Sequence, residues 1–105
     1  MTGADEIEDA ELEVLDAFEH PHGGRILRVR SAGGRPLSLK DLRGARIAAV
    51  SPEGSVGRAR IVSFPLTGGR PSEKRFRDTG RLDLLVAEED GPPISLGWRL
   101  RLRDR

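Results

Sequence analysis

The sequence predicts an all-β protein, a small closed barrel of six to seven short strands. The first observation is a series of apolar runs in which every second residue is polar, which is the alternation expected of a strand with one buried face. The second is that the 13 glycines and 7 prolines gather in clusters between those runs, as turn residues do. The third is the length of 105 residues, which suits one domain with a modest core. Closure into a barrel leaves such short strands without exposed edges.

The N-terminal part divides into an acidic leader and a first strand. Residues 1–10 are polar and acidic, and we expect a disordered leader ahead of a single barrel domain at 11–105. The first strand is expected at 11–19, where alternate positions are apolar and Asp16 is the exception. The apolar positions of that strand are Leu12, Val14 and Phe18.

A hairpin in residues 41–64 is the clearest local element. An apolar run at 45–51 leads into a Pro-Glu-Gly turn at 52–54, and a second run follows at 55–64. Ala59 and Ile61 share one face of the second run, because side chains of a strand alternate between its faces. The residues that share the opposite face are Val56, Arg58, Arg60, Val62 and Phe64.

The remaining elements follow from the same two signals, alternation and turn residues. In chain order they are a turn at 20–24, a strand at 25–31, one helical turn within 37–42, a loop at 65–72, a short strand or linker at 73–77, a strand at 81–88, a connection rich in acids and prolines at 88–93, and a last strand at 98–103. In the last strand Trp98 has the parity of the leucines, so we expect it in the core.

Charge is distributed unevenly although the net charge is only +1. All 18 lysines and arginines lie from Arg25 onward, and only Lys40 and Lys74 are lysines. A basic body attracts anionic partners in a salt-dependent manner, and an acidic leader on the same chain is able to compete with them. The acids that precede the first base are Asp5, Glu6, Glu8, Asp9, Glu11, Glu13, Asp16 and Glu19.

Composition excludes several classes of chemistry. The absence of cysteine excludes disulfides, thiolate catalysis and cysteine-ligated zinc. No run approaches the roughly 18 apolar residues of a transmembrane helix, and the start of the chain lacks the basic and apolar regions of a signal peptide. We therefore expect a cytoplasmic protein without membrane contact and without a cofactor. Whether it is a monomer or a homodimer is not decided by the sequence.

Landmarks follow one another along the chain in this order: Val29-Arg30-Ser31, Gly33-Gly34, Leu42-Arg43-Gly44-Ala45-Arg46-Ile47, Ser51-Pro52-Glu53-Gly54, Ala59-Arg60-Ile61-Val62-Ser63-Phe64, Gly80-Arg81-Leu82-Asp83-Leu84-Leu85-Val86 and Ile94-Ser95-Leu96-Gly97-Trp98-Arg99-Leu100. Their order and spacing resemble the second domain of translational GTPases such as elongation factor Tu. The resemblance implies a six-stranded Greek-key barrel that contacts RNA or protein, and it covers roughly residues 13–102. Ala45 stands where that family usually has an acid, the segment between Gly33 and Gly44 is longer than usual, and the chain has no Gly-x-x-x-x-Gly-Lys-Ser/Thr loop.

Rows of arginine on the expected strands are the leading candidate site. They form one positive surface if their strands are neighbours, and such a surface suits RNA or an acidic protein surface. The alternative is a solvated outer face that is paired with acids across strands. No aromatic residue suited to base stacking is interleaved with the rows. The candidate residues are Arg28, Arg30, Arg58, Arg60, Arg99, Arg101 and Arg103.

Two further motifs suggest chemistry. His20 and His22 have a spacing suited to a metal, but no third ligand is near them, so we expect no metal site. Asp78-Thr79-Gly80 matches the catalytic tripeptide of aspartic proteases, which a short chain supplies twice by dimerising. Arg77 and Arg81 flank it where that family has apolar or small residues, which favours a turn. We expect a non-catalytic binding module; the alternatives are an RNA-binding accessory protein and a dimeric aspartic-type hydrolase.

Overall fold

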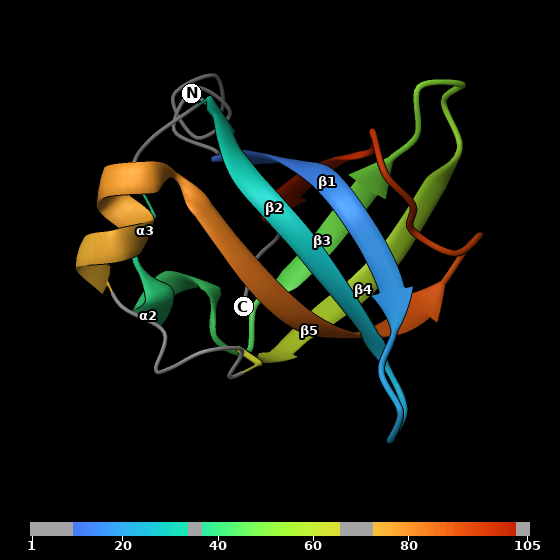
Figure 1. Cartoon of the computed structure of the whole chain (residues 1–105). Coiled ribbons are helices and arrows are strands. Elements are labelled where there is room, and N and C mark those ends of the chain that lie inside the picture. The colour runs from blue at the N-terminus through green and yellow to red at the C-terminus, as the bar shows by residue number, and fades with distance from the viewer. Residues whose placement is uncertain (1–9, 34–36, 66–72, 103–105) are drawn as a thin grey trace, which may run out of the picture.

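Six antiparallel strands form a closed barrel in the computed structural model, which describes residues 10–33, 37–65 and 73–102 (Figure 1). Around the ring the strand order is β1-β2-β5-β4-β3-β6, and β6 pairs with β1 to close it. The strands are β1 (Glu11–Glu19), β2 (Arg25–Gly33), β3 (Arg46–Val50), β4 (Val56–Ser63), β5 (Arg81–Asp90) and β6 (Arg99–Leu102). The expected all-β barrel is therefore confirmed.

The strand order is that of a Greek key. β3, β4 and β5 are consecutive neighbours, and β6 returns past them to lie beside β3. A fourth strand that returns to the first of three consecutive ones defines this motif. The same crossover places β3 between β4 and β6, three strands whose sequences carry outward-facing arginines.

Inward-facing aliphatic side chains of all six strands form one core, as the alternation predicted. Trp98 is 8% exposed, so the expectation that it belongs to the core is confirmed. Gly57 lies beside the Trp98 ring, and a Cβ there would be 3.6 Å from the ring, an ordinary contact, but only 3.0 Å from the Pro92 carbonyl oxygen, which would have to shift slightly. The fully buried large side chains are Leu12, Val14, Leu27, Val29, Leu42, Ile47, Ile61, Leu84, Val86, Ile94 and Leu100.

Two irregularities of register correct the expected side-chain parities. In β1 the register against β2 shifts between Val14 and Asp16, so Ala17 packs against the core and Phe18 is 38% exposed. A bulge of this kind reverses the alternation, which explains why Asp16 broke the pattern. In β4 the register shifts between Ile61 and Ser63, and Phe64 is consequently buried rather than outward.

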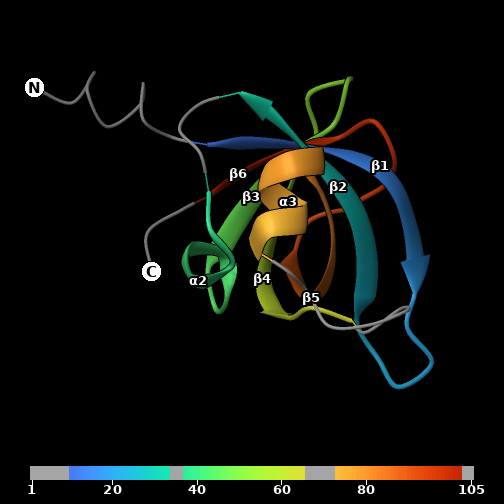
Figure 2. The ribbon, with the colours of Figure 1, turned by 60° about the vertical axis from the view of Figure 1, so that its left-hand side comes forward.

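Two short helices, α2 (Leu39–Leu42) and α3 (Glu73–Thr79), lie side by side at one end of the barrel (Figure 2). α2 is the expected helical turn, and Ser38 closes a capping box with Asp41 at its start. The expectation of a short strand or linker at 73–77 was wrong, because this segment is part of the helix α3. The helix buries one side chain, Phe76, in the core and leaves its other side chains exposed. The Gly80 N–H, at a φ of +70°, donates to the Phe76 carbonyl at 2.7 Å and ends the helix.

Other strand boundaries differ from the predicted ones by a few residues. β2 and β5 extend past the expected ends to Gly33 and Asp90. The expected disorder of residues 1–10 falls mostly outside the described residues, but Ala10 is described and is 3% exposed. The packed barrel thus includes Ala10. No helix within residues 10–33, 37–65 and 73–102 is long and apolar enough to cross a membrane.

Candidate functional site

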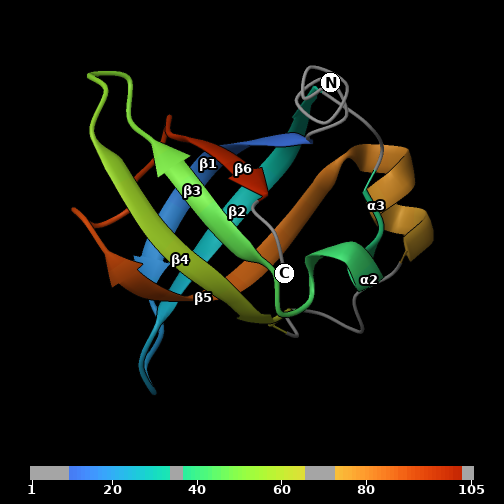
Figure 3. The same cartoon turned by 180° about the vertical axis from the view of Figure 1, so that it is seen from behind.

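The outer surface of β4, β3 and β6 carries a group of arginines on three adjacent strands. We call the outward-facing side chains of these strands the basic face. The strands β3, β4 and β6 that carry it lie on the near side of the barrel in Figure 3. Neighbouring strands of a sheet lie about 4.8 Å apart, so the backbones of β4 and β6 are separated by about 10 Å across β3. The outward residues are Arg46, Ala48, Val50, Val56, Arg58, Arg60, Val62, Arg99 and Arg101.

Ala48 is the centre of the basic face. It is the register partner of Arg58 on β4 and of Arg101 on β6, so it lies between two arginines in one row across the sheet. Arg46, the next outward residue of β3, is the register partner of Arg60. The side chain of half-buried Ala48 is a single methyl group, so the surface at this position is lower than at the four arginine side chains around it.

Four arginines of the basic face have no acidic partner among the described residues. Within the described part of the chain, no ion pair, side-chain hydrogen bond or ring contact engages Arg46, Arg58, Arg60 or Arg101. Arg58 is opposite Asp90 in the β4–β5 register, yet the two side chains form no ion pair.

The fifth arginine of the face is partly neutralised. Arg99 is 3.7 Å from the Glu11 carboxylate, which lies on the neighbouring strand β1 at the border of the face. The net charge of the basic face is therefore strongly positive, and its acids lie only at the edges.

The arginine row of β2 has a different environment. In the ring, β2 is separated from β4 by β5 and from β6 by β1, so Arg28 and Arg30 do not join the basic face. Arg28 donates two hydrogen bonds to Asp83, at 3.1 and 3.3 Å, and Arg30 donates two to Glu13, at 3.0 and 2.9 Å. The hydrogen bond and the charge of Asp83 raise the pKa of Arg28 above its ordinary value. This row is neutralised within the protein.

The structure thus divides the seven predicted site residues. Arg58, Arg60, Arg99 and Arg101 come together, and Arg103 lies outside the described residues. Sequence reasoning missed Arg46, since it is a single arginine in an otherwise apolar run. The signal that could have found it is the hairpin register, which places Arg46 opposite Arg60.

Apolar side chains complete the basic face. Val50 is 36% exposed, and Val56 and Val62 are each 49% exposed. Val50 and Val56 are register partners, so they form a small apolar area at one end of the face. Because no aromatic residue is among the outward positions of β3, β4 and β6, this surface offers charge and aliphatic contact rather than base stacking.

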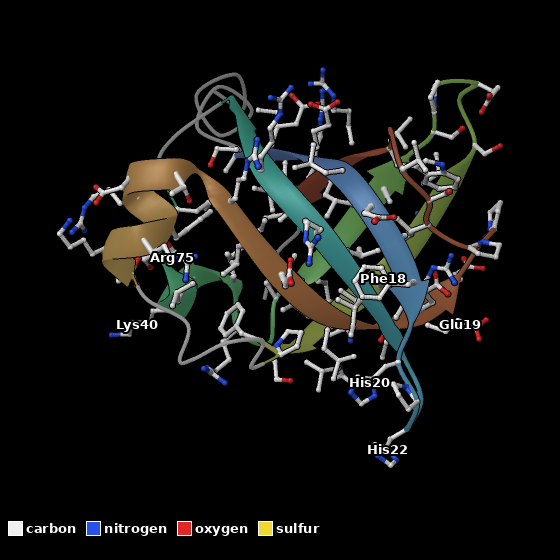
Figure 4. The ribbon with its side chains drawn as sticks, viewed as in Figure 1. Phe18, Glu19, His20, His22, Lys40 and Arg75 are labelled. Carbon is white, nitrogen blue, oxygen red and sulfur yellow. The ribbon has the colours of Figure 1, made fainter. Side chains whose placement is uncertain are left out.

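The histidine pair is remote from the basic face. His20 and His22 follow β1 in the turn to β2 and point away from the barrel, as Figure 4 shows beside Phe18 and Glu19. The His22 backbone N–H donates to Nδ1 of His20 at 3.1 Å, so that nitrogen already has a partner. No group of three metal-ligating side chains occurs among the residues that the structure describes.

The Asp-Thr-Gly tripeptide lies at the end of α3. Asp78 is exposed and accepts a hydrogen bond of 2.6 Å from the ammonium group of Lys74, one turn earlier in the helix. Thr79 donates its hydroxyl to the Arg75 carbonyl and accepts from the Arg81 N–H. These contacts are local to the C-terminal end of α3.

Comparisons with known proteins do not extend these observations. No family model matches the chain, and neither a curated protein nor a solved structure shows significant similarity to it. We therefore infer function from the basic face.

Proposed function

We propose that this protein is a non-catalytic binding module, and that its basic face holds an anionic macromolecule. One observation carries the proposal: four arginines on three adjacent strands have no acidic partner within the described residues. Two of them, Arg46 and Arg60, are direct register partners. Like charges directly opposite one another in a sheet destabilise it.

The protein's own second arginine row is the internal comparison. Arg28 and Arg30 each have an acid on a neighbouring strand, which is the ordinary arrangement for a solvated outer face. On the basic face the register also places acids opposite two arginines, Asp90 opposite Arg58 and Glu11 opposite Arg101. Neither acid forms an ion pair with the arginine opposite it, although the sequence contains 17 acids. An anionic partner supplies the missing charges, and arginine forks suit both phosphate and carboxylate.

The likeness to the second domain of translational GTPases remains a hypothesis within this proposal, as does a cytoplasmic location. The Greek-key order of the strands is compatible with that likeness, but fold alone does not carry function over. No observation favours the aspartic-type hydrolase, and we do not propose it.

A pair of matched double variants tests the proposal. R58Q/R101Q removes two unpaired charges from the basic face, and R28Q/R30Q removes two paired charges from β2. Binding of the full chain to a labelled 12-nucleotide uridine RNA and to labelled poly-L-glutamate is measured by fluorescence anisotropy from 20 to 300 mM NaCl. We expect R58Q/R101Q to weaken binding of at least one polyanion about tenfold or more at low salt, and R28Q/R30Q to change it less than about threefold.

Two results contradict the proposal. One is the absence of binding of either polyanion to the wild-type chain at 20 mM NaCl. The other is an equal loss of binding in the two double variants, since that would mean that total charge rather than the basic face determines affinity.

A further inference from the structure

We infer that the basic face binds the phosphodiester backbone of a nucleic acid, with one phosphate group seated above Ala48. The inference rests on the proposed function and names the partner of the same face. Its starting point is the register, because Ala48 is aligned with Arg58 on one side and with Arg101 on the other. Arg46 precedes it by two residues on the same strand face, so three arginines surround this position.

The seat above Ala48 suits phosphate better than carboxylate. A carboxylate presents two oxygens in one plane, which match the fork of a single guanidinium. A phosphodiester presents two non-bridging oxygens on a tetrahedral phosphorus, so its acceptor directions are not confined to one plane and several arginines can donate to it at once. Arg46, Arg58 and Arg101 approach from three sides of Ala48, and no acidic side chain of the described residues engages any of them.

The extent of the face favours a polymer over a free phosphate compound. Arg60 lies beyond the seat, opposite Arg46, and Arg99 lies at the other end, opposite Val50. Successive outward residues of one strand are about 6.6 Å apart, so the cations continue along the strands past a single phosphate. A chain of phosphates lying along β3 meets these cations in turn.

The face provides backbone contact without base readout. Phosphate contacts position a nucleic acid but carry no sequence information. The exposed side chains beside the arginines are Val50, Val56 and Val62. Valine side chains neither donate hydrogen bonds to base edges nor accept them. We therefore expect binding that depends little on base sequence and strongly on salt.

Substitution of Ala48 itself tests the seat while all arginines are kept. Ala48→Glu places a carboxylate among Arg46, Arg58 and Arg101, where it competes with the phosphate. Ala48→Gln is the matched control, with the same size and no charge. The probes are the labelled 12-nucleotide uridine RNA, poly-L-glutamate and, as a competitor, uridine monophosphate, all measured with the full chain at 50 mM NaCl.

We expect A48E to weaken RNA binding at least tenfold more than A48Q does, with both variants retaining cooperative thermal unfolding. For the wild-type chain, a plot of the logarithm of the RNA association constant against the logarithm of the salt concentration should have a slope near −2.8. Single-stranded nucleic acid contributes about −0.7 for each phosphate contact, and four unpaired arginines are available. Uridine monophosphate should compete at least a hundredfold more weakly than unlabelled RNA. An equal loss in A48E and A48Q overturns the assignment of the seat.

The outcomes also separate this inference from the proposed function. Binding of poly-L-glutamate as tight as binding of RNA overturns the phosphate partner but leaves an anion-binding module. If uridine monophosphate competes as well as RNA, the inference that the face binds a polymer rather than a free phosphate compound is overturned. If no polyanion binds the wild-type chain, the inference and the proposed function both fail.

Discussion

The opposition of Arg46 and Arg60 predicts that reversing one of these charges stabilises the barrel. They are direct register partners on the outer face of β3 and β4, and neither has an acidic partner in the described part of the chain. Two unit charges about 6 Å apart interact by roughly 0.7 kcal/mol in water. Arg46→Gln removes this repulsion, and Arg46→Glu converts it to attraction. Cross-strand pairs contribute about 0.2–1 kcal/mol each, so we expect gains of about 0.5 kcal/mol for Gln and about 1 kcal/mol for Glu.

Urea unfolding at two salt concentrations measures this effect. At 20 mM NaCl the free energy of unfolding should rise in the order wild type, R46Q, R46E. At 1 M NaCl the Debye length is about 3 Å, so the differences should shrink to a third or less. Arg28→Glu is the control, because it breaks the ion pair with Asp83 and should destabilise the protein. A stability order that is unaffected by salt, or a loss of stability in R46E at low salt, would refute the electrostatic reasoning.

Two further predictions concern the β5–β6 connection and the acidic leader. Gly91→Ala places a Cβ 2.4 Å from the Val56 carbonyl oxygen at a φ of +87°, whereas Gly54→Ala meets no atom within 4 Å at a φ of +97°. We expect Gly54→Ala to lower the free energy of unfolding by about 1–2 kcal/mol through backbone conformation alone. Gly91→Ala should lower it by at least about 2 kcal/mol more, because the added Cβ also clashes. Equal losses of stability in chemical denaturation would contradict the close packing at Gly91. Neutralising the acids of residues 1–9 in the full chain (D5N/E6Q/E8Q/D9N) should tighten RNA binding severalfold at low salt, because negative charges on the same chain reduce the positive potential that attracts an anion. Unchanged affinity in the same anisotropy assay would show that the leader does not compete.

Much of the fold could be predicted because strand alternation and turn residues are local signals. β1 was predicted with its observed bounds, and the hairpin of β3 and β4 followed from an apolar run and an alternating run on the two sides of a Pro-Glu-Gly turn. α3 was missed because its one buried residue, Phe76, gives no helical periodicity. Lys74 and Asp78 at a spacing of four, with Gly80 after the end, were the available helix signals.

The candidate site shows what only the tertiary structure decided. The sequence by itself determined that Arg58, Arg60, Arg99 and Arg101 face outward, because side chains alternate along a strand. It could not determine which strands are neighbours, since pairing joins segments that are far apart along the chain. The Greek-key order inserted β3 between β4 and β6, and acids on neighbouring strands neutralised the row of β2. Register then aligned Ala48 with two arginines, and this alignment, rather than the number of arginines, is the reason that we propose the basic face as the candidate site.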